Sequence, residues 1–203
     1  MTPLGRRQAE TFPSRTPQLQ QQVDLLVTSP LKRALYTTLL AWEPAVARLG
    51  IENVLVLPEA QECADEPCDT GSPLEVLASN QDFKGLNFAR VTPDWTSKKG
   101  FYAPDPASLA DRAKFIRRFL RDRPEKDIVL VCHGDFLRQL TCDASGPSRV
   151  YWRNAEMRIY KFDPATVDQE ECLFQLEEAP EATRGYSRRS TEADLDEILQ
   201  GKI

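Results

Sequence analysis

The only histidine of the sequence, His133, stands at the end of an apolar run and directly before a glycine, Gly134. The run, Ile128 to Cys132, is typical of a buried strand, which would present the histidine at its end. A glycine there lets backbone N–H groups approach a ligand closely, and a protonated histidine beside such groups can hold an oxyanion. A lone histidine is more often structural, and this alternative stays open on the segment alone.

A second candidate, Arg33, adds a positive charge. The residues Ser29 and Pro30 turn a short apolar strand into a helix, and Arg33 falls in the first turn of that helix. A cation is poorly placed there against the helix dipole unless an anion lies nearby. Arg33 is therefore a candidate anion ligand, although Lys32 and Arg33 are adjacent and both also fit an exposed helix face.

A long acidic stretch from Pro58 to Pro73 supplies carboxyl groups. Loops of this length are uncommon unless they are functional or disordered. Five carboxylates lie in it: Glu59, Glu62, Asp65, Glu66 and Asp69. One of them can act as a general acid if partial burial raises its pKa, whereas a solvated loop is the alternative for any single one. A positive anion site with a carboxyl group near it indicates phosphoryl chemistry.

Alternating strands and helices must bring these groups together. Strands are expected at 24–28, 53–57, 127–132 and 151–162, with an edge strand at 172–176, and helices at 31–49, 72–79 and 105–123. This order predicts an α/β fold, a three-layer sandwich with a mostly parallel sheet and helices on both faces. Ligands of such sheets bind at the carboxyl ends of the strands, where the candidate residues lie.

Length and composition narrow the class of protein. The 203 residues, 41% apolar and 28% charged, suit one soluble domain at 1–179 with a charged, mobile tail at 180–203. No apolar run approaches the roughly 18 residues of a membrane span, and the first residues do not form a secretory signal, so a cytoplasmic or nuclear location is expected. Five cysteines without a CxxC pair favour reduced thiols, and a net charge of −5 argues against nucleic-acid binding.

Four blocks in this order resemble the histidine phosphatase superfamily, the phosphoglycerate mutase-like proteins, and especially its divergent branch common in fungi. The blocks are Pro3-Leu4-Gly5 to Gln8-Ala9, "SPLKRALYT" at 29–37, "LPEAQECADEPCDTGSP" at 57–73 and "VLVCHGDFLRQL" at 129–140. They span nearly the whole chain. The resemblance implies the phosphoglycerate mutase-like α/β sandwich, in agreement with the pattern of strands and helices.

The resemblance also implies roles for single residues. Arg33 matches a phosphate-binding arginine, and His133 matches the second histidine, which hydrogen-bonds the phosphoryl group beside Gly134. Glu62 best matches the proton donor, with Glu59 as the alternative because Ala60 stands where the family usually has leucine. The family needs no metal and no cofactor. The implied ligand is a small phosphorylated metabolite, and neither a nucleic acid nor a membrane is expected as a partner.

One family block has no counterpart in the sequence. Family members begin with a strand that ends in Arg-His-Gly, whose histidine attacks phosphorus to form a phosphohistidine. We therefore expect an N-terminally incomplete domain that lacks its first central strand and has little phosphomonoesterase activity. Two functions stay open: a phosphomonoester hydrolase, favoured over a mutase by analogy, or a catalytically inactive pseudophosphatase that serves as a binding or regulatory protein.

Overall fold

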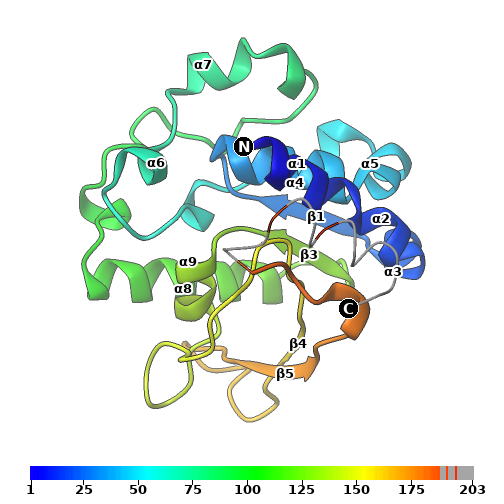
Figure 1. The fold of residues 1–203 in the computed structure, drawn as a ribbon. Coiled ribbons are helices and arrows are strands. Elements are labelled where there is room, and N and C mark those ends of the chain that lie inside the picture. Colours follow the sequence, from blue (N-terminus) through cyan, green and yellow to red (C-terminus); the bar gives the residue numbers. More distant parts are fainter. Residues whose placement is uncertain (188–190, 192–194, 196–203) are drawn as a thin grey trace.

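The sheet at the centre of the molecule has three parallel strands. A computed structural model of the chain describes residues 1–187, 191 and 195 (Figure 1). The strands β1 (Leu25–Thr28), β2 (Leu55–Val56) and β3 (Ile128–Val131) lie in the order β2-β1-β3. Val27 of β1 is in register with Leu55 of β2 and with Leu130 of β3. The parallel sheet predicted from the apolar pattern is confirmed.

Helices cover both faces of this sheet (Figure 1). One face carries α1 (Pro3–Glu10), α2 (Phe12–Arg15), α3 (Pro17–Gln22), α4 (Lys32–Ala41) and α5 (Glu43–Leu49), and the other carries α8 (Pro106–Arg121) and α9 (Gly134–Leu140). Because side chains alternate along a strand, β1 serves two cores. Leu26 packs with the first group of helices, and Leu25 and Val27 pack with the second. The expected three-layer sandwich is confirmed.

A proline divides the helix that was predicted at 31–49. The structure has α4 and α5 instead, and the chain turns at Trp42 between them. Pro44 lies in the first turn of α5. A proline inside a continuous helix would lack one backbone hydrogen bond and clash with the carbonyl four residues earlier, here that of Leu40. The break lets both short helices pack against the sheet.

A separate antiparallel pair, β4 (Ile159–Phe162) and β5 (Phe174–Glu178), lies beyond β3. The prediction of a strand over 151–162 was too long, because only its last four residues pair with another strand. Earlier in that segment, Asn154 forms an isolated bridge with Tyr186. The segment before Ile159 therefore lies beside Tyr186, near the C-terminal end of the described residues.

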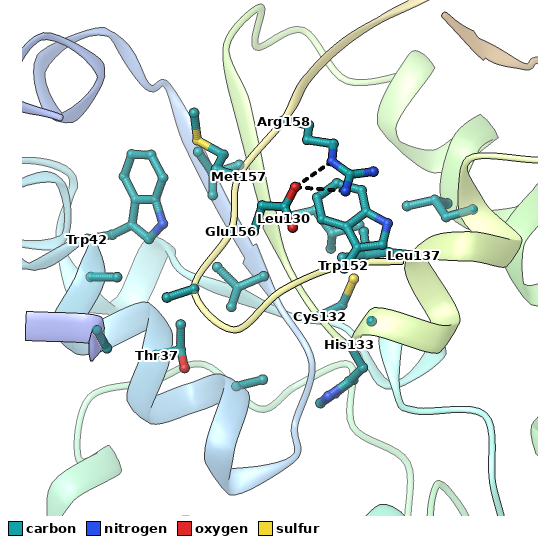
Figure 2. Close-up of a pocket in the computed structure, with 18 of the residues that line it drawn as sticks. Thr37, Trp42, Leu130, Cys132, His133, Leu137, Trp152, Glu156, Met157 and Arg158 are labelled. Atoms are coloured by element: carbon teal, nitrogen blue, oxygen red, sulfur yellow. Dashed lines mark hydrogen bonds and ion pairs between the residues drawn. The ribbon is translucent and has the colours of Figure 1, made fainter. Parts of the chain in front are cut away.

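An open cavity of about 1580 Å³ separates β3 from β4. Leu130, Trp152, Met157 and the ion pair of Glu156 with Arg158 line it, and it extends to His133 (Figure 2). Among the described residues, no strand pairs with the edge of β3 that faces away from β1. The expected loss of a first central strand stays a prediction.

The remaining short elements complete the fold. They are α6 (Pro67–Thr70), α7 (Leu74–Ala78) and the single-turn 3-10 helices η1 (Ile51–Asn53), η2 (Pro58–Ala60), η3 (Gln81–Phe83), η4 (Gly100–Tyr102) and η5 (Glu181–Thr183). Phe83, Trp95 and Tyr102, in the segment between α7 and α8, are buried. Within the described part of the chain, no helix combines the length and apolar character needed to cross a membrane.

The described part of the C-terminal segment packs against the first helices. Tyr186 is buried, and its hydroxyl lies 2.8 Å from the hydroxyl of Thr11. Arg15 donates to the hydroxyl of Tyr186 and to the carbonyl of Arg184. Most of the predicted mobile tail at 180–203 lies outside the described residues, and the domain boundary after residue 179 stays a prediction.

Candidate anion-binding site

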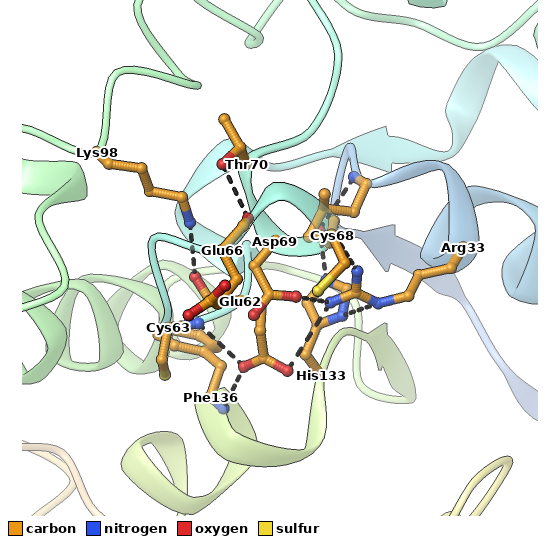
Figure 3. Close-up of polar contacts among 12 residues, drawn as sticks. Arg33, Glu62, Cys63, Glu66, Cys68, Asp69, Thr70, Lys98, His133 and Phe136 are labelled. Atoms are coloured by element: carbon orange, nitrogen blue, oxygen red, sulfur yellow. Dashed lines mark hydrogen bonds and ion pairs between the residues drawn. The ribbon is translucent and has the colours of Figure 1, made fainter. Parts of the chain in front are cut away.

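A polar cluster stands at the carboxyl edge of the parallel sheet (Figure 3). Ser29 directly follows β1, Glu62 comes from the loop after β2, and His133 links β3 to α9. Arg33 reaches them from the first turn of α4. The structure therefore brings together three of the residues predicted from the sequence, Arg33, Glu62 and His133.

The imidazole of His133 is buried and held at both nitrogens. Its Nδ1 lies 3.2 Å from Nε of Arg33, and its Nε2 lies 2.8 Å from Oγ of Ser29. Since an arginine Nε can only donate, Nδ1 must accept, which places the ring proton on Nε2. Burial, followed by the charges of Arg33, Lys98 and Arg112, holds the pKa of His133 well below its usual 6.5. The ring is neutral, whereas the sequence argument invoked a protonated one.

Arg33 contacts His133 and the acidic loop at once. Its Nη1 donates to the carbonyl of Cys68, and its Nη2 lies 2.9 Å from a carboxylate oxygen of Asp69. A carboxylate oxygen of Glu62 is 3.9 Å from Nη2. The predicted anion ligand thus pairs with carboxylates of the protein itself, and its role in binding an external anion stays a prediction.

Glu62 is fixed both by its backbone and by its carboxylate. Its carbonyl accepts from Nζ of Lys98 at 3.2 Å and faces Nη2 of Arg112 at 3.5 Å. Its carboxylate accepts from the backbone N–H of Cys63 and from that of Phe136 in the first turn of α9. A carboxylate there satisfies a helix N–H and complements the helix dipole. Burial, as the largest effect, nevertheless raises the pKa of Glu62.

The two candidate proton donors have different surroundings. Burial is also the main cause that raises the pKa of Glu59. The charged groups that act on the pKa of Glu59 are Arg90 and Arg112, and burial, followed by the charge of Glu59, raises the pKa of Tyr102 in turn. The carboxyl group of Glu59 therefore faces the segment between α7 and α8. Of these two candidate proton donors, Glu62 is the one whose carboxylate lies beside Arg33.

Gly134 is the first residue of α9. A Cβ added to it would lie 3.7 Å from Cβ of Trp152, which is ordinary van der Waals contact. Its backbone is not in the left-handed region either. The space near its N–H therefore does not require a glycine, and its role in binding stays a prediction.

Sequence reasoning missed Ser29, Lys98 and Arg112. Arg112 is fully buried on the apolar stripe of α8, and its guanidinium lies 4.8 Å from the ring centre of Phe136. A charged residue at helical spacing among apolar ones was the signal that could have identified it, although Arg117 on the same face carries the same signal. Its Nε and Nη1 have no hydrogen-bond partner among the described residues. For Ser29 and Lys98 the sequence carries no comparable signal.

The described residues offer no obvious place for a metal ion. No three His, Cys, Asp or Glu side chains within them form a group that could hold one. All five cysteines of the sequence are free thiols. The expectation that the reaction needs no metal and no cofactor stays a prediction.

The fold and the site define an α/β protein with a cluster of Arg33, Glu62 and His133 at the carboxyl edge of its sheet. The histidine phosphatase superfamily (branch 1) matches residues 1–172, and the chain belongs to this superfamily. A probable phosphatase of Schizosaccharomyces pombe is 27% identical over 136 residues, which are 66% of this chain. The matched region spans 62% of the length of that relative.

Solved structures confirm the phosphoglycerate mutase-like fold. A mycobacterial glucosyl-3-phosphoglycerate phosphatase superposes with a TM-score of 0.53 at 21% identity, over 91% of this chain and 88% of its own. The alpha-ribazole phosphatase from Shigella flexneri gives a TM-score of 0.50 at 17% identity, over 92% of this chain and 87% of its own. At these identities the similarity demonstrates the fold alone.

Proposed function

We propose that this chain binds the phosphoryl group of a small phosphorylated metabolite at the carboxyl edge of its sheet. The observation that carries the proposal is the direct contact of Arg33 with His133, with Glu62 beside them. A guanidinium and an imidazole on one side of a pocket supply the charge and donors that a phosphate dianion needs. Backbone N–H groups at the start of α9, including that of Gly134, add further donors.

Binding of a dianion changes the protonation of the site. A negative charge beside His133 favours the imidazolium, which opposes the lowering of its pKa by burial and by Arg33. The imidazolium can donate from both nitrogens, whereas the neutral ring donates only from Nε2. Once it has taken up a proton from solvent at Nδ1, His133 can donate to the phosphoryl group, provided that Nε of Arg33 also turns from Nδ1 to the anion.

Glu62 is the proton donor in this proposal. Its raised pKa keeps a larger fraction of the carboxyl group protonated, as a general acid requires for a leaving alkoxide. Its place next to Arg33 supports Glu62 over Glu59, since Glu59 faces Tyr102 and Arg112 instead.

Turnover is expected to be low in this chain. By resemblance, family members hydrolyse phosphomonoesters through a phosphohistidine, which splits one hard displacement into two easier steps. His133 is the single histidine of the sequence, and both of its ring nitrogens are engaged, so it is unsuited to attack phosphorus. The second candidate is therefore a pseudophosphatase that binds phosphorylated ligands, and the five free thiols support a cytoplasmic or nuclear location for either function.

The test measures binding and turnover separately. Titration calorimetry with inorganic phosphate should detect binding that R33A weakens at least about tenfold, the value of one strong charged hydrogen bond. The matched control is K32A, which removes the same charge one residue earlier. Failure of the purified chain to bind phosphate, or equal losses in both variants, would contradict the proposed site.

Hydrolysis of a generic aryl phosphate should stay near the uncatalysed rate. Robust turnover that His133→Ala abolishes would contradict the proposed inactivity. It would imply direct attack by water at a site held by Arg33 and His133.

A further inference from the structure

The guanidinium of Arg33 is already occupied by an anion that belongs to the protein. Asp69 reaches it at 2.9 Å, and the carbonyl of Cys68 accepts a second hydrogen bond from it (Figure 3). Both groups belong to the four-residue helix α6. The Asp69 side chain is 14% exposed, against 36% for Arg33, so the pair is partly shielded from solvent. Any anion that binds Arg33 must replace this carboxylate.

The loop around α6 presents Asp69 in a defined way. The backbone N–H groups of Asp69 and Thr70 and the hydroxyl of Thr70 all donate to the carbonyl of Glu66. At the other end, Gly71 has a φ of 90°, and a Cβ there would lie 2.1 Å from Cη2 of Trp95. The chain after Asp69 is therefore fixed against a buried ring.

The outer side of this loop is free of such packing. Asp65 to Cys68 are exposed. In the part of the chain that the structure describes, the hydrogen bonds that join α6 to residues beyond the neighbouring Glu66 come from Arg33. Release of Arg33 by Asp69 thus breaks few other contacts, and exchange of one anion for another is structurally simple.

We propose that Asp69 is an intramolecular competitor that makes this site select dianionic phosphoryl groups against monoanions. The inference rests on the proposed function and names the charge of its ligand. A carboxylate tethered beside Arg33 acts at an effective concentration of about millimolar or more, so a dissolved monoanion of similar chemistry displaces it poorly. A phosphate dianion carries a second negative charge, and it has a third oxygen that can accept hydrogen bonds from His133 and the N–H groups of α9. It therefore displaces the carboxylate of Asp69 from Arg33.

The alternative is a purely structural ion pair, in which Asp69 only keeps Arg33 in place. The two ideas predict opposite results when the charge of Asp69 is removed. Loss of a competitor strengthens binding of anions to Arg33, whereas loss of a structural partner leaves Arg33 less well oriented and weakens binding.

The experiment is titration calorimetry on the full chain with two probes at pH 8, inorganic phosphate, which is mainly dianionic there, and the monoanion dimethyl phosphate. D69N should bind inorganic phosphate about tenfold more tightly than the wild type, and it should bind dimethyl phosphate, which the wild type should not. The matched control, D65N, removes the same charge from the same loop at an exposed position. Its affinities should stay within about twofold of the wild type.

Each outcome has one meaning. Unchanged or weaker phosphate binding by D69N, with wild-type binding that depends on Arg33, overturns this inference and leaves the proposed function intact. Equal gains in D69N and D65N also overturn it, since the effect would be one of net charge. Absence of phosphate binding in the wild type and in both variants overturns the proposed function as well. Melting temperatures confirm folding, and Asp69→Ala replaces D69N under the same criteria if D69N does not fold.

Discussion

Ser29 sets the orientation of His133 through a single buried hydrogen bond. Its Oγ accepts the proton of Nε2 at 2.8 Å, and both side chains are almost fully buried. Ser29→Ala leaves that N–H without a partner, which costs about 1 to 3 kcal/mol in the free energy of unfolding. Urea denaturation measures this, and the same variant should weaken phosphate binding. As a control, Ser79→Ala on the exposed end of α7 should change neither quantity, and a silent Ser29→Ala would contradict the hydrogen bond between Ser29 and His133.

The neutral state of His133 makes folding sensitive to acid. Since its pKa in the folded protein is lower than the usual 6.5, the unfolded chain takes up the proton first as the pH falls. The contribution of the neutral His133 to the free energy of unfolding is complete above pH 6.5. Below pH 6.5 this contribution decreases by up to about 1.4 kcal/mol per pH unit. The raised pKa of Glu62 acts in the opposite direction, as its contribution is lost when the pH rises above 4.5.

This effect is measured as a difference between two proteins. The free energy of unfolding of the wild type should fall more between pH 7.5 and pH 5.5 than that of His133→Gln. Glutamine retains a hydrogen-bonding group but does not titrate. Parallel pH profiles for the two proteins would be incompatible with a neutral, buried His133.

Residue types alone indicated part of the site. His133 and Arg33 were identifiable because a histidine at a strand end and a cation in a first helical turn are unusual placements. The pairing of Arg33 with Asp69 joins residues 36 positions apart, and nothing in the local sequence specifies which of five carboxylates turns inward. That choice depends on how the loop folds over Trp95.

At the scale of elements, the end of α6 depends on a glycine. Gly71 and Gly100 both have a positive φ, 90° and 56°, but only Gly71 faces a neighbouring ring. Gly71→Ala should therefore lower the free energy of unfolding by about 2 to 5 kcal/mol, the sum of backbone strain and overpacking against Trp95. Gly100→Ala should lower it by about 1 to 2 kcal/mol, from backbone strain alone. Similar losses in thermal or urea unfolding would contradict the close approach of Gly71 to Trp95.

Periodicity predicted the elements with the most regular patterns. The strand β3 and the helix α8 were found within a few residues of their ends, because apolar runs and an Asp105 cap are local signals. The division into α4 and α5 and the short β4 were missed. Pro44 is a local signal for the helix break, which the apolar periodicity of 31–49 outweighed in the prediction. The bounds of β4 depend instead on its pairing with β5, which follows a loop.

At the scale of the whole molecule, the gap between β3 and β4 leaves one side of β3 without a paired strand among the residues that the structure describes. Leu25 and Ser29 donate to the carbonyls of Asp127 and Val131, so alternate residues of β3 face β1. Leu130 is not one of these alternate residues, so its backbone groups face away from β1 and toward the cavity. Its amide should exchange with solvent at least about tenfold faster than those of Val129 and Val131, as measured by hydrogen exchange in NMR. Equal protection of the three amides would demonstrate that something covers this edge.

The contact between Tyr186 and Thr11 carries a consequence for the order of folding. It joins residues 175 positions apart, and the entropy lost on closing a loop grows with the logarithm of its length. If this contact formed before the sheet, it would cost nearly the full loop-closure entropy of the chain between Thr11 and Tyr186. It therefore forms after the strands have brought those partners together, and native fluctuations should release it early. Such an opening separates the segment before β4 from the first helices in one step.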